Sequence, residues 1–241
     1  MNTKRHYESH LANFYFWMVG DFEKGVKDFK SFLEEQNVKP KLNKTALDLG
    51  SGNGMQSIAM KQLGFYVKAV DFSQKLLNEL KVRPESNGIE LVNMDITDVH
   101  KFRDVNPELV VCAGDTLTHL ESKEQIRKFL KDCVDILSPK GHIVLTFRDY
   151  CFELKGDAKF IPVKSDENRI FTCILNYADD YVQVTDLLYE RINGSWQQKV
   201  STYEKTRISG DDVIDSLKNN NLEIVFNGSL NRMVHIVARK Q

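Results

Sequence analysis

The sequence predicts an α/β protein built on a doubly wound, seven-stranded, mostly parallel sheet. Strand-like and helical segments alternate from residue 45 to residue 147, which is the pattern of such sheets. The continuous apolar run 109–113 is typical of a strand covered on both faces. A glycine-rich loop follows the first expected strand, where open α/β sheets bind ligands. We expect one domain over residues 1–241, with an antiparallel lid inserted after the fifth strand.

Residues 1–40 are expected to form an N-terminal gate and a helix, since apolar side chains recur at helical spacing from Phe22 to Leu33. Residues 41–150 are expected to form the ligand-binding core. Its strands are expected at 45–49, 66–70, 89–94, 109–113 and 142–147, and its helices at 55–63, 74–82 and 126–137.

The alternation stops after Arg148, and residues 151–208 are expected to form the lid. Turn signals at Asp179-Asp180 and Asn193-Gly194 separate strand-like segments and predict antiparallel hairpins. These segments are 169–176, 181–191 and 196–208. Residues 209–241 then supply a helix, which begins with a capping box of Ser209 and Asp212, and two closing strands at 222–226 and 233–238.

Charge and cysteine content exclude several classes of function. The 33 Lys and Arg residues balance 34 Asp and Glu residues, so no global field attracts nucleic acid or an anionic membrane. No apolar run reaches the roughly 20 residues of a membrane helix. The four cysteines have no metal-type spacing and are expected to be reduced thiols. We therefore expect a cytoplasmic protein with a small-molecule substrate, no nucleic acid or membrane partner and no metal; the sequence does not predict its oligomeric state.

The segment Leu47–Gly54 reads LDLGSGNG and is expected to form a ligand-binding loop from Gly50, Ser51 and Gly52. Dinucleotide sites use GxGxxG, whereas here Met55 stands at the place of the third glycine. Asp48 lies inside the motif, where it would repel a pyrophosphate and could orient an ammonium group. The loop therefore argues against NAD and favours a cationic, phosphate-free nucleoside.

Acidic residues end the next two strands. Asp71 can accept hydrogen bonds from two ribose hydroxyls, and Phe72 can cover one face of an adenine. Asp95 can accept from an adenine amino group. The alternative for each acid alone is a cap on the following helix, but their joint placement after successive strands favours a nucleoside site.

These segments resemble the class I S-adenosylmethionine-dependent methyltransferases, and most closely the small-molecule enzymes of the glycine N-methyltransferase type. The matching pieces are the glycine loop, Val70–Ser73, Cys112–Leu120, Leu137–Gly141 and Phe147–Tyr150. The resemblance implies a Rossmann-like methyltransferase fold with S-adenosylmethionine as cofactor. It implies cofactor contacts from Gly50, Gly52, Asp71, Asp95, Ile96, Ala113 and Gly114, with Tyr15 and Trp17 around the methionine end.

Two positions depart from the glycine N-methyltransferase pattern. The family's arginine for the cofactor carboxylate falls near Gly25, which has only Lys24 beside it. A family asparagine of the substrate pocket corresponds to Asp115. The resemblance therefore identifies the methyl donor and does not extend to glycine as the acceptor.

Methyl transfer to an amine requires a neutral nitrogen, so a nearby group must take its proton. Asp115 and His119 follow the fourth strand and are the candidate catalytic residues; the alternative for His119 is a histidine at a helix start. By the resemblance, Arg148 clamps a substrate carboxylate, with Tyr150 beside it. The alternative for Arg148 is an ion pair with Asp149 or with an acid of the lid. Tyr203 and Arg207, at the end of the lid, are expected to complete the pocket.

The expected function is methyl transfer from S-adenosylmethionine to a small amine or amino-carboxylate. Two alternatives stay open: O-methylation of a small carboxylate or hydroxyl, and a protein that binds S-adenosylmethionine without transfer. The same fold can support each of them, because function is set by the site.

Overall fold

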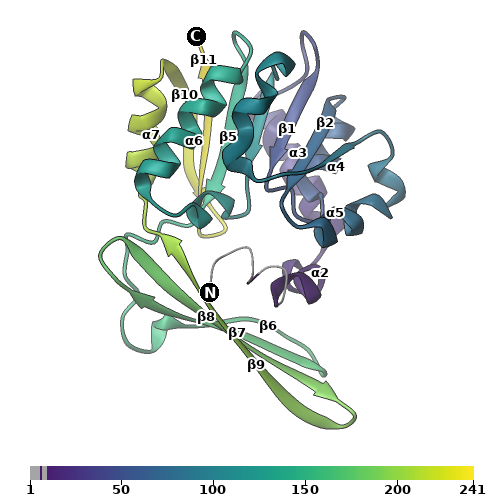
Figure 1. Cartoon of the computed structure of the whole chain (residues 1–241), viewed down its shortest axis with the longest axis vertical. Coiled ribbons are helices and arrows are strands. Elements are labelled where there is room, and N and C mark those ends of the chain that lie inside the picture. The colour runs from purple at the N-terminus through teal and green to yellow at the C-terminus, as the bar shows by residue number, and fades with distance from the viewer. Residues whose placement is uncertain (1–5, 7–9) are drawn as a thin grey trace.

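The computed structural model describes residue 6 and residues 10–241. Figure 1 shows a sheet flanked by helices, with a second, smaller sheet beneath it. The main sheet has seven strands in the order β10-β11-β5-β4-β1-β2-β3. They are β1 (Thr45–Leu49), β2 (Tyr66–Asp71), β3 (Glu90–Asn93), β4 (Leu109–Cys112), β5 (His142–Phe147), β10 (Leu222–Leu230) and β11 (Met233–Lys240).

The strand directions confirm the predicted fold class. Strands β1 to β5 pair in parallel, and β11 runs antiparallel between β5 and β10. The chain first builds outward through β2 and β3 and then returns to place β4 on the other side of β1. This reversal opens a crevice at the carboxyl ends of β1 and β4, where sheets of this kind bind ligands.

Helices cover both faces of the main sheet, as the strand sequences require. Alternate residues of one strand belong to different cores: Val110 and Cys112 pack on one face, and Leu109 and Val111 on the other. The first core includes the 3-10 helix η3 (Ile96–Val105), η4 (Thr116–His119), α6 (Lys123–Ile136) and α7 (Gly210–Asn219). The second includes α3 (Phe22–Glu35), α4 (Met55–Gln62) and α5 (Gln74–Lys81).

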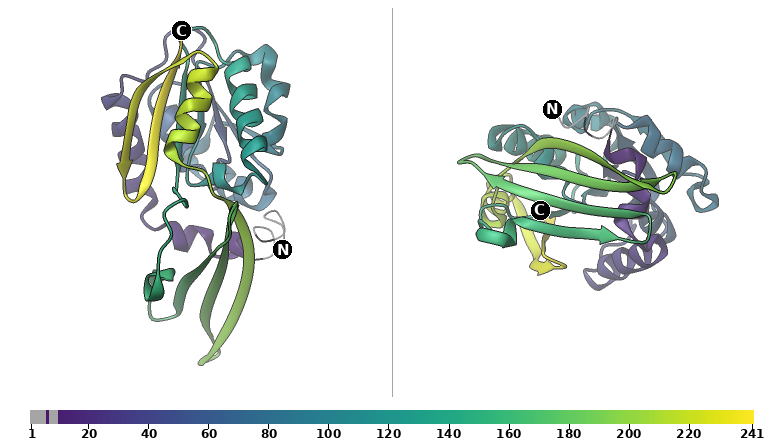
Figure 2. Two further views of the ribbon diagram at one scale, coloured as in Figure 1. Left: turned by 90° about the vertical axis from the view of Figure 1, so that its left-hand side faces the viewer. Right: turned by 90° about the horizontal axis from the view of Figure 1, so that it is seen from below.

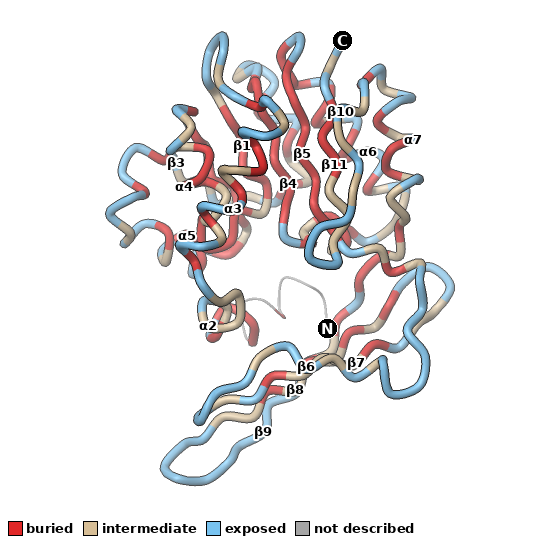
Figure 3. The backbone as a smooth tube through the Cα atoms, turned by 180° about the vertical axis from the view of Figure 1, so that it is seen from behind, coloured by how far each residue is buried: buried red, intermediate tan, exposed pale blue. Residues whose placement is uncertain are grey.

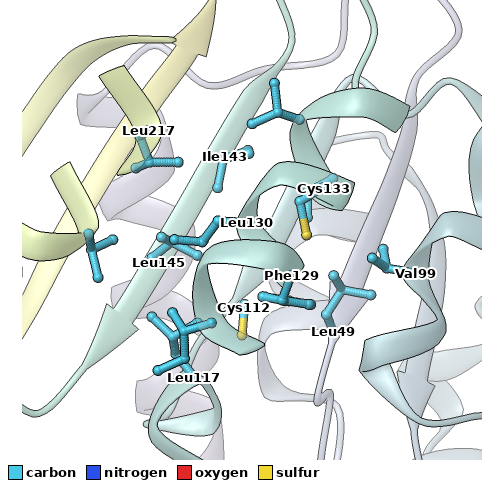
Figure 4. Close-up of a cluster of buried hydrophobic side chains, with 14 of the residues drawn as sticks. Leu49, Val99, Cys112, Leu117, Phe129, Leu130, Cys133, Ile143, Leu145 and Leu217 are labelled. Carbon is cyan, nitrogen blue, oxygen red and sulfur yellow. The ribbon is translucent and has the colours of Figure 1, made fainter. Parts of the chain in front are cut away.

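The first core is densest between α6 and the middle strands, where Phe129 and Leu130 lie against Leu49, Cys112 and Leu145 (Figure 4). Helix α6 begins where the Ser122 hydroxyl accepts a hydrogen bond from the Gln125 N–H. Helix α7 begins with the predicted capping box, because Ser209 and Asp212 exchange backbone-to-side-chain hydrogen bonds. None of the helices in residues 10–241 is both long and apolar enough to cross a membrane.

The second sheet is the lid. Its strands are β6 (Phe160–Ser165), β7 (Arg169–Tyr177), β8 (Tyr181–Ile192) and β9 (Ser195–Thr206), in that order and antiparallel throughout. The sequence did not predict β6, because Pro162 interrupts it; an edge strand tolerates this proline, and the pairing is irregular beside it. The view from below in Figure 2 shows the lid stretched beneath the core.

Burial is concentrated in the middle of the main sheet (Figure 3), and the buried residues of the lid lie on β7, β8 and β9. Phe171 of β7 and Leu188 of β8 belong to a cluster with residues of α2 (Tyr15–Val19). On β8 the buried residues alternate from Val182 to Leu188. Among these apolar side chains lies one fully buried carboxylate, Asp186. The lid therefore has a mixed apolar and polar inner face.

Phe129→Ala should lower the free energy of unfolding by about 3–5 kcal/mol, since it removes a buried aromatic side chain from the first core. Lys128→Ala, on the exposed side of the same helix turn, should change it by less than about 0.5 kcal/mol. Denaturant titration of both variants measures the difference. Equal losses would contradict the assignment of this helix face to the core.

Candidate functional site

A cavity of about 800 Å³ opens at the carboxyl ends of β1, β2 and β4. Its inner wall contains eight of the predicted cofactor residues: Tyr15, Gly50, Gly52, Asp71, Phe72, Asp95, Ile96 and Gly114. The wall continues past His119 to the start of α6 and to the edge of the lid. The cavity thus lies between the core and the lid.

The glycine loop needs its glycines for both backbone conformation and space. Gly50 has a φ of 78°, and a Cβ there would lie 2.4 Å from the Thr116 side chain. The Gly50 and Ser51 N–H groups both donate to the Val70 carbonyl, at 2.8 and 3.0 Å. The loop is therefore held against the end of β2, with Gly52 facing the cavity.

Asp71 joins this loop to the next one. Its Oδ2 accepts from the Gly52 N–H and its Oδ1 from the Ser73 N–H, both at 2.8 Å. Burial raises the pKa of Asp71 to about 6. Each carboxylate oxygen keeps a second lone pair, so Asp71 can still accept from two neighbouring hydroxyl groups. The side chain therefore braces the loop and keeps acceptor capacity at the cavity wall.

Asp95 combines the two interpretations that the sequence left open. Its Oδ1 accepts from the Thr97 N–H at 2.9 Å and from the Thr97 hydroxyl at 2.7 Å, so it caps η3. Asp95 and Ile96 also line the cavity, across from Phe72 on the loop after β2. A flat apolar ring could lie between Phe72 and Ile96 with its polar edge toward Asp95.

The two aromatic residues predicted to enclose the cofactor take different positions. Tyr15 lines the cavity beside the glycine loop, and a Cβ on Gly52 would lie 3.3 Å from its hydroxyl. Burial, with Asp71 nearby, raises the pKa of Tyr15. Trp17 does not line the cavity: its Nε1 donates to Asp166 of the lid at 2.5 Å. Helix α2 therefore connects the glycine loop to the lid.

Asp48, Ser51 and Ala113 lie beneath the cavity wall. The Asp48 carboxyl accepts from the Ser57 hydroxyl at 2.5 Å, and burial raises its pKa to about 7. Since Asp48 does not reach the cavity, it supports the loop from below. Gly114 does line it, and a Cβ on this residue would meet nothing within 4 Å, so its backbone faces open space.

Asp115 is the polar centre of the contact between core and lid. Its Oδ1 accepts from the Arg148 N–H at 2.9 Å and the Thr118 hydroxyl at 3.0 Å. Its Oδ2 accepts from the Tyr150 hydroxyl at 2.8 Å and forms an ion pair with Lys205. Burial opposes ionisation, but Lys205 and the Arg148 N–H outweigh it and lower the pKa of Asp115.

These four interactions occupy the lone pairs of the Asp115 carboxylate, and the residue does not line the cavity. The geometry therefore does not support the expected proton-accepting role, because no acceptor site faces a substrate. Asp115 instead attaches the lid to the core.

His119 is the predicted catalytic residue that does reach the cavity. Its ring stacks with Tyr203 of the lid, with centroids 5.7 Å apart and an interplanar angle of 25°. Burial, aided by Lys205, lowers the pKa of His119 well below its ordinary value. The imidazole is therefore neutral near pH 7, as a proton acceptor must be, although the same shift makes it a weaker base than an exposed histidine.

The four predicted substrate residues Arg148, Tyr150, Tyr203 and Arg207 do not line the cavity. Arg148 is half-exposed, with its Nε 3.9 Å from Asp115 Oδ2. This partner is an acid of the core, whereas the expected alternative was an ion pair with Asp149 or with an acid of the lid. Its role as a carboxylate clamp stays a prediction. Tyr150, which follows β5, and Tyr203 of the lid are buried in one cluster with apolar residues of β7 and β8.

Arg207 has a structural position at the base of the lid. It donates to the carbonyls of Tyr150 and Cys151, both at 3.2 Å, and to that of Ala178. It also pairs with Glu153 at 3.0 Å. With its donors engaged in this way, Arg207 closes the base of the lid rather than the substrate pocket.

Sequence reasoning missed Lys205 and the outer wall of the cavity. Lys205 lies on the same face of β9 as Ser201 and Tyr203, and this spacing of two residues was the signal that it points inward. The outer wall carries four carboxylates and one ammonium, and that ammonium, of Lys123, lies 3.7 Å from Asp212. These carboxylates are Glu121, Glu124, Asp180 and Glu204. The outer wall is therefore acidic.

Comparison with known proteins finds methyltransferases. A methyltransferase-domain profile matches residues 46–141. A glycine/sarcosine N-methyltransferase of Aphanothece halophytica is 30% identical over 109 residues, which cover 44% of this chain and 41% of that protein. Mouse glycine N-methyltransferase is 26% identical over 181 residues, 68% of this chain and 62% of the mouse protein. The matched region thus spans less than two thirds of either relative.

Solved structures share the fold over nearly the whole chain. An S-adenosylmethionine-dependent methyltransferase of Clostridium acetobutylicum superposes with a TM-score of 0.73 at 17% identity, covering 96% of this chain and 97% of that one. An amino pentose methyltransferase of Micromonospora echinaspora, involved in calicheamicin biosynthesis and bound to S-adenosylmethionine, superposes with a TM-score of 0.74 at 14% identity, covering 94% of this chain and 95% of that one. At such identities the likeness shows the fold.

Asp115→Asn should lower the free energy of unfolding by about 3–5 kcal/mol, because it leaves the Lys205 ammonium buried without its counter-charge. The double variant Asp115→Asn/Lys205→Met should regain much of this loss.

The same ion pair predicts a dependence of stability on pH. Because the pKa of Asp115 is lowered in the folded state, the contribution of this carboxylate to stability is complete above its unfolded pKa of about 3.9 and is lost as the pH falls through its folded pKa. Denaturant titrations at neutral and acidic pH measure both effects; a double variant less stable than the single one would contradict the ion-pair account.

Proposed function

The chain belongs to the class I S-adenosylmethionine-dependent methyltransferases, and we propose that it transfers the methyl group of S-adenosylmethionine to a small-molecule amine. The observation that carries this proposal is the cavity in which the glycine loop, Asp71 and the Asp95-Ile96 pair meet at the switch point of the sheet. This wall suits a nucleoside without phosphates, since it presents carboxylates rather than cations.

The described residues fit the cofactor on three grounds. Asp71 has acceptor capacity left for ribose hydroxyls beside the N–H groups it already holds. Gly114 faces open space where a side chain would intrude. Phe72 and Ile96 offer apolar faces for an adenine, with Asp95 at its edge. Tyr15 would cover the bound molecule from the side of α2.

When bound, S-adenosylmethionine supplies a methyl group already activated by a positively charged sulfur. The protein therefore has to align the acceptor nitrogen and exclude water, and orientation of this kind can contribute roughly 7–11 kcal/mol. Tyr15 of α2 and the lid residues Asp180, Tyr181, Glu204 and Thr206 form part of the cavity wall. His119 holds a neutral imidazole at the cavity wall and can take the proton that the amine loses.

Two observations favour an amine as acceptor. Several curated relatives are named glycine/sarcosine N-methyltransferases, although another is named a ubiquinone biosynthesis O-methyltransferase, and one solved structure of the same fold is an amino pentose methyltransferase. The outer wall is acidic, so it attracts a protonated amine and does not repel it as a basic wall would. The methyl-transfer assay must distinguish this N-methylation from two alternatives, namely O-methylation and binding of S-adenosylmethionine without transfer.

Asp71→Asn should weaken S-adenosylhomocysteine binding by about 1.5–3 kcal/mol, or about 10- to 150-fold in Kd, because it removes charged acceptors from the ribose. Calorimetric titration measures the change, and Asp98→Asn on the exposed side of η3 is the control. A dideoxyribose analogue separates binding from loop support: its affinity should fall far less. Equal losses for both ligands would remove Asp71 from the ribose.

His119→Phe should keep the ring stack with Tyr203 and lower kcat by about 10²–10⁴-fold, because the proton acceptor is lost. His100→Phe, at an exposed position, should leave kcat unchanged. Since the pKa of His119 is lowered well below 6.5, its base form persists below pH 6.5, and wild-type kcat should fall only in more acidic buffer. Transfer of a labelled methyl group to a panel of small amines, alcohols and carboxylates measures kcat, its pH dependence and the class of acceptor. Transfer to oxygen alone would contradict an amine acceptor.

A further inference from the structure

The imidazole of His6 fills a polar site on the inner face of the lid. The residues around it are distant from His6 in the sequence: Ser201, for example, is 195 positions away. The His6 side chain is fully buried. Its ring stacks on Tyr203 at 3.9 Å with an interplanar angle of 23°, and its Nδ1 lies 2.8 Å from the Ser201 hydroxyl. Its Nε2 lies 3.4 Å from Asp186 Oδ2. We call the space bounded by Asp186, Ser201 and Tyr203 the His6 site.

Asp186 is the group that makes this site unusual. It is fully buried on the inner face of β8, and its Oδ1 accepts from the Cys173 thiol at 3.1 Å. Its Oδ2 has no hydrogen-bond donor among the described residues, and the His6 ring is at ion-pair distance only. Lys205, a nearby buried cation, is already paired with Asp115. The site therefore aims a carboxylate oxygen at whatever occupies it.

The charges of this region do not balance. Among the described residues, two buried carboxylates, Asp115 and Asp186, face one buried ammonium, that of Lys205. His6 does not supply a second positive charge, because burial, aided by His10, Lys205 and the N-terminal ammonium, lowers its pKa to about 3. A buried carboxylate without a cation is costly. A bound cationic group would compensate the negative charge of Asp186, whereas the neutral imidazole of His6 does not.

The His6 site adjoins the cofactor cavity through aromatic rings. Tyr203 stacks with His6 and also with His119, and His119 lines the cavity. A molecule anchored in the His6 site would therefore have to extend past these two rings to reach the cavity. A single small group in the site cannot do so, whereas a molecule with a second functional group can.

We propose that the His6 site binds the cationic end of the methyl acceptor, in the place that the His6 imidazole holds, through Asp186 and Ser201. The acceptor is then a small amine with two functional groups: a cationic or imidazole-like anchor and, a few bonds away, the nitrogen that is methylated. A carboxylate anchor is excluded, since Asp186 would repel it. This inference rests on the proposed function, and it makes His6 a resident competitor of the acceptor.

A binding experiment tests the site without any methyl transfer. The probe is imidazole, titrated by calorimetry into the S-adenosylhomocysteine complexes of His6→Ala and His6→Ala/Asp186→Asn. We expect imidazole to bind His6→Ala and to bind the double variant at least tenfold more weakly. Equal affinity for the two variants would overturn the role of Asp186. His6→Ala/Glu223→Gln is the control, since Glu223 is exposed and pairs with Arg239.

Turnover then tests whether the site belongs to the acceptor. With ethylenediamine as acceptor, Asp186→Asn should raise KM at least tenfold and His6→Ala should lower it severalfold, while the Kd of S-adenosylhomocysteine stays unchanged. Ser201→Ala provides a second, milder variant and should raise KM in the same direction. Ethylenediamine should have a lower KM than ethylamine or glycine; a preference for glycine would overturn this inference and leave amine methylation intact. Transfer to no amine at all would refute the proposed function, whereas the imidazole titration would still decide the site.

Discussion

The buried Asp115 carboxylate is the constraint on which the arrangement of the site depends. It accepts hydrogen bonds from the loop after β4, from the residues that follow β5 and from Lys205 on β9. These segments are brought together from three distant parts of the chain, and their common partner holds the lid over the carboxyl edge of the sheet. The left-handed backbone of Asp115, with a φ of 75°, directs the chain away from β4 so that Gly114 and His119 can line the cavity.

The lid contributes chemistry as well as cover. Its inner face carries Tyr203, Lys205 and Asp186 at alternate positions that a purely structural sheet would fill with apolar side chains. Burying such groups is unfavourable unless each has a partner. Lys205 has one in Asp115; among the described residues, the partners of Asp186 are a thiol and a neutral imidazole. The polar inner face is therefore better explained by a polar ligand than by the stability of the lid.

Local patterns were enough to predict which residues meet at the inner wall of the cavity. Gly50, Gly52, Asp71 and Asp95 act through the backbone next to them and through the ends of adjacent parallel strands, and both are visible in the sequence. The acceptor end depends on how the lid folds back, and spacing along the chain contains no such information. Arg207 reads as a pocket cation but satisfies carbonyls at the lid base, and Lys205 reads as a surface residue but pairs with Asp115 across 90 positions.

The central claim is that the cavity at the switch point binds S-adenosylmethionine and presents its methyl group to a small amine. The most direct test is a crystal structure of the protein with S-adenosylhomocysteine. We predict that the ribose hydroxyls lie within hydrogen-bond distance of Asp71, the adenine lies between Phe72 and Ile96, and the sulfur faces His119. A ligand bound elsewhere, or a ribose directed away from Asp71, would contradict the account.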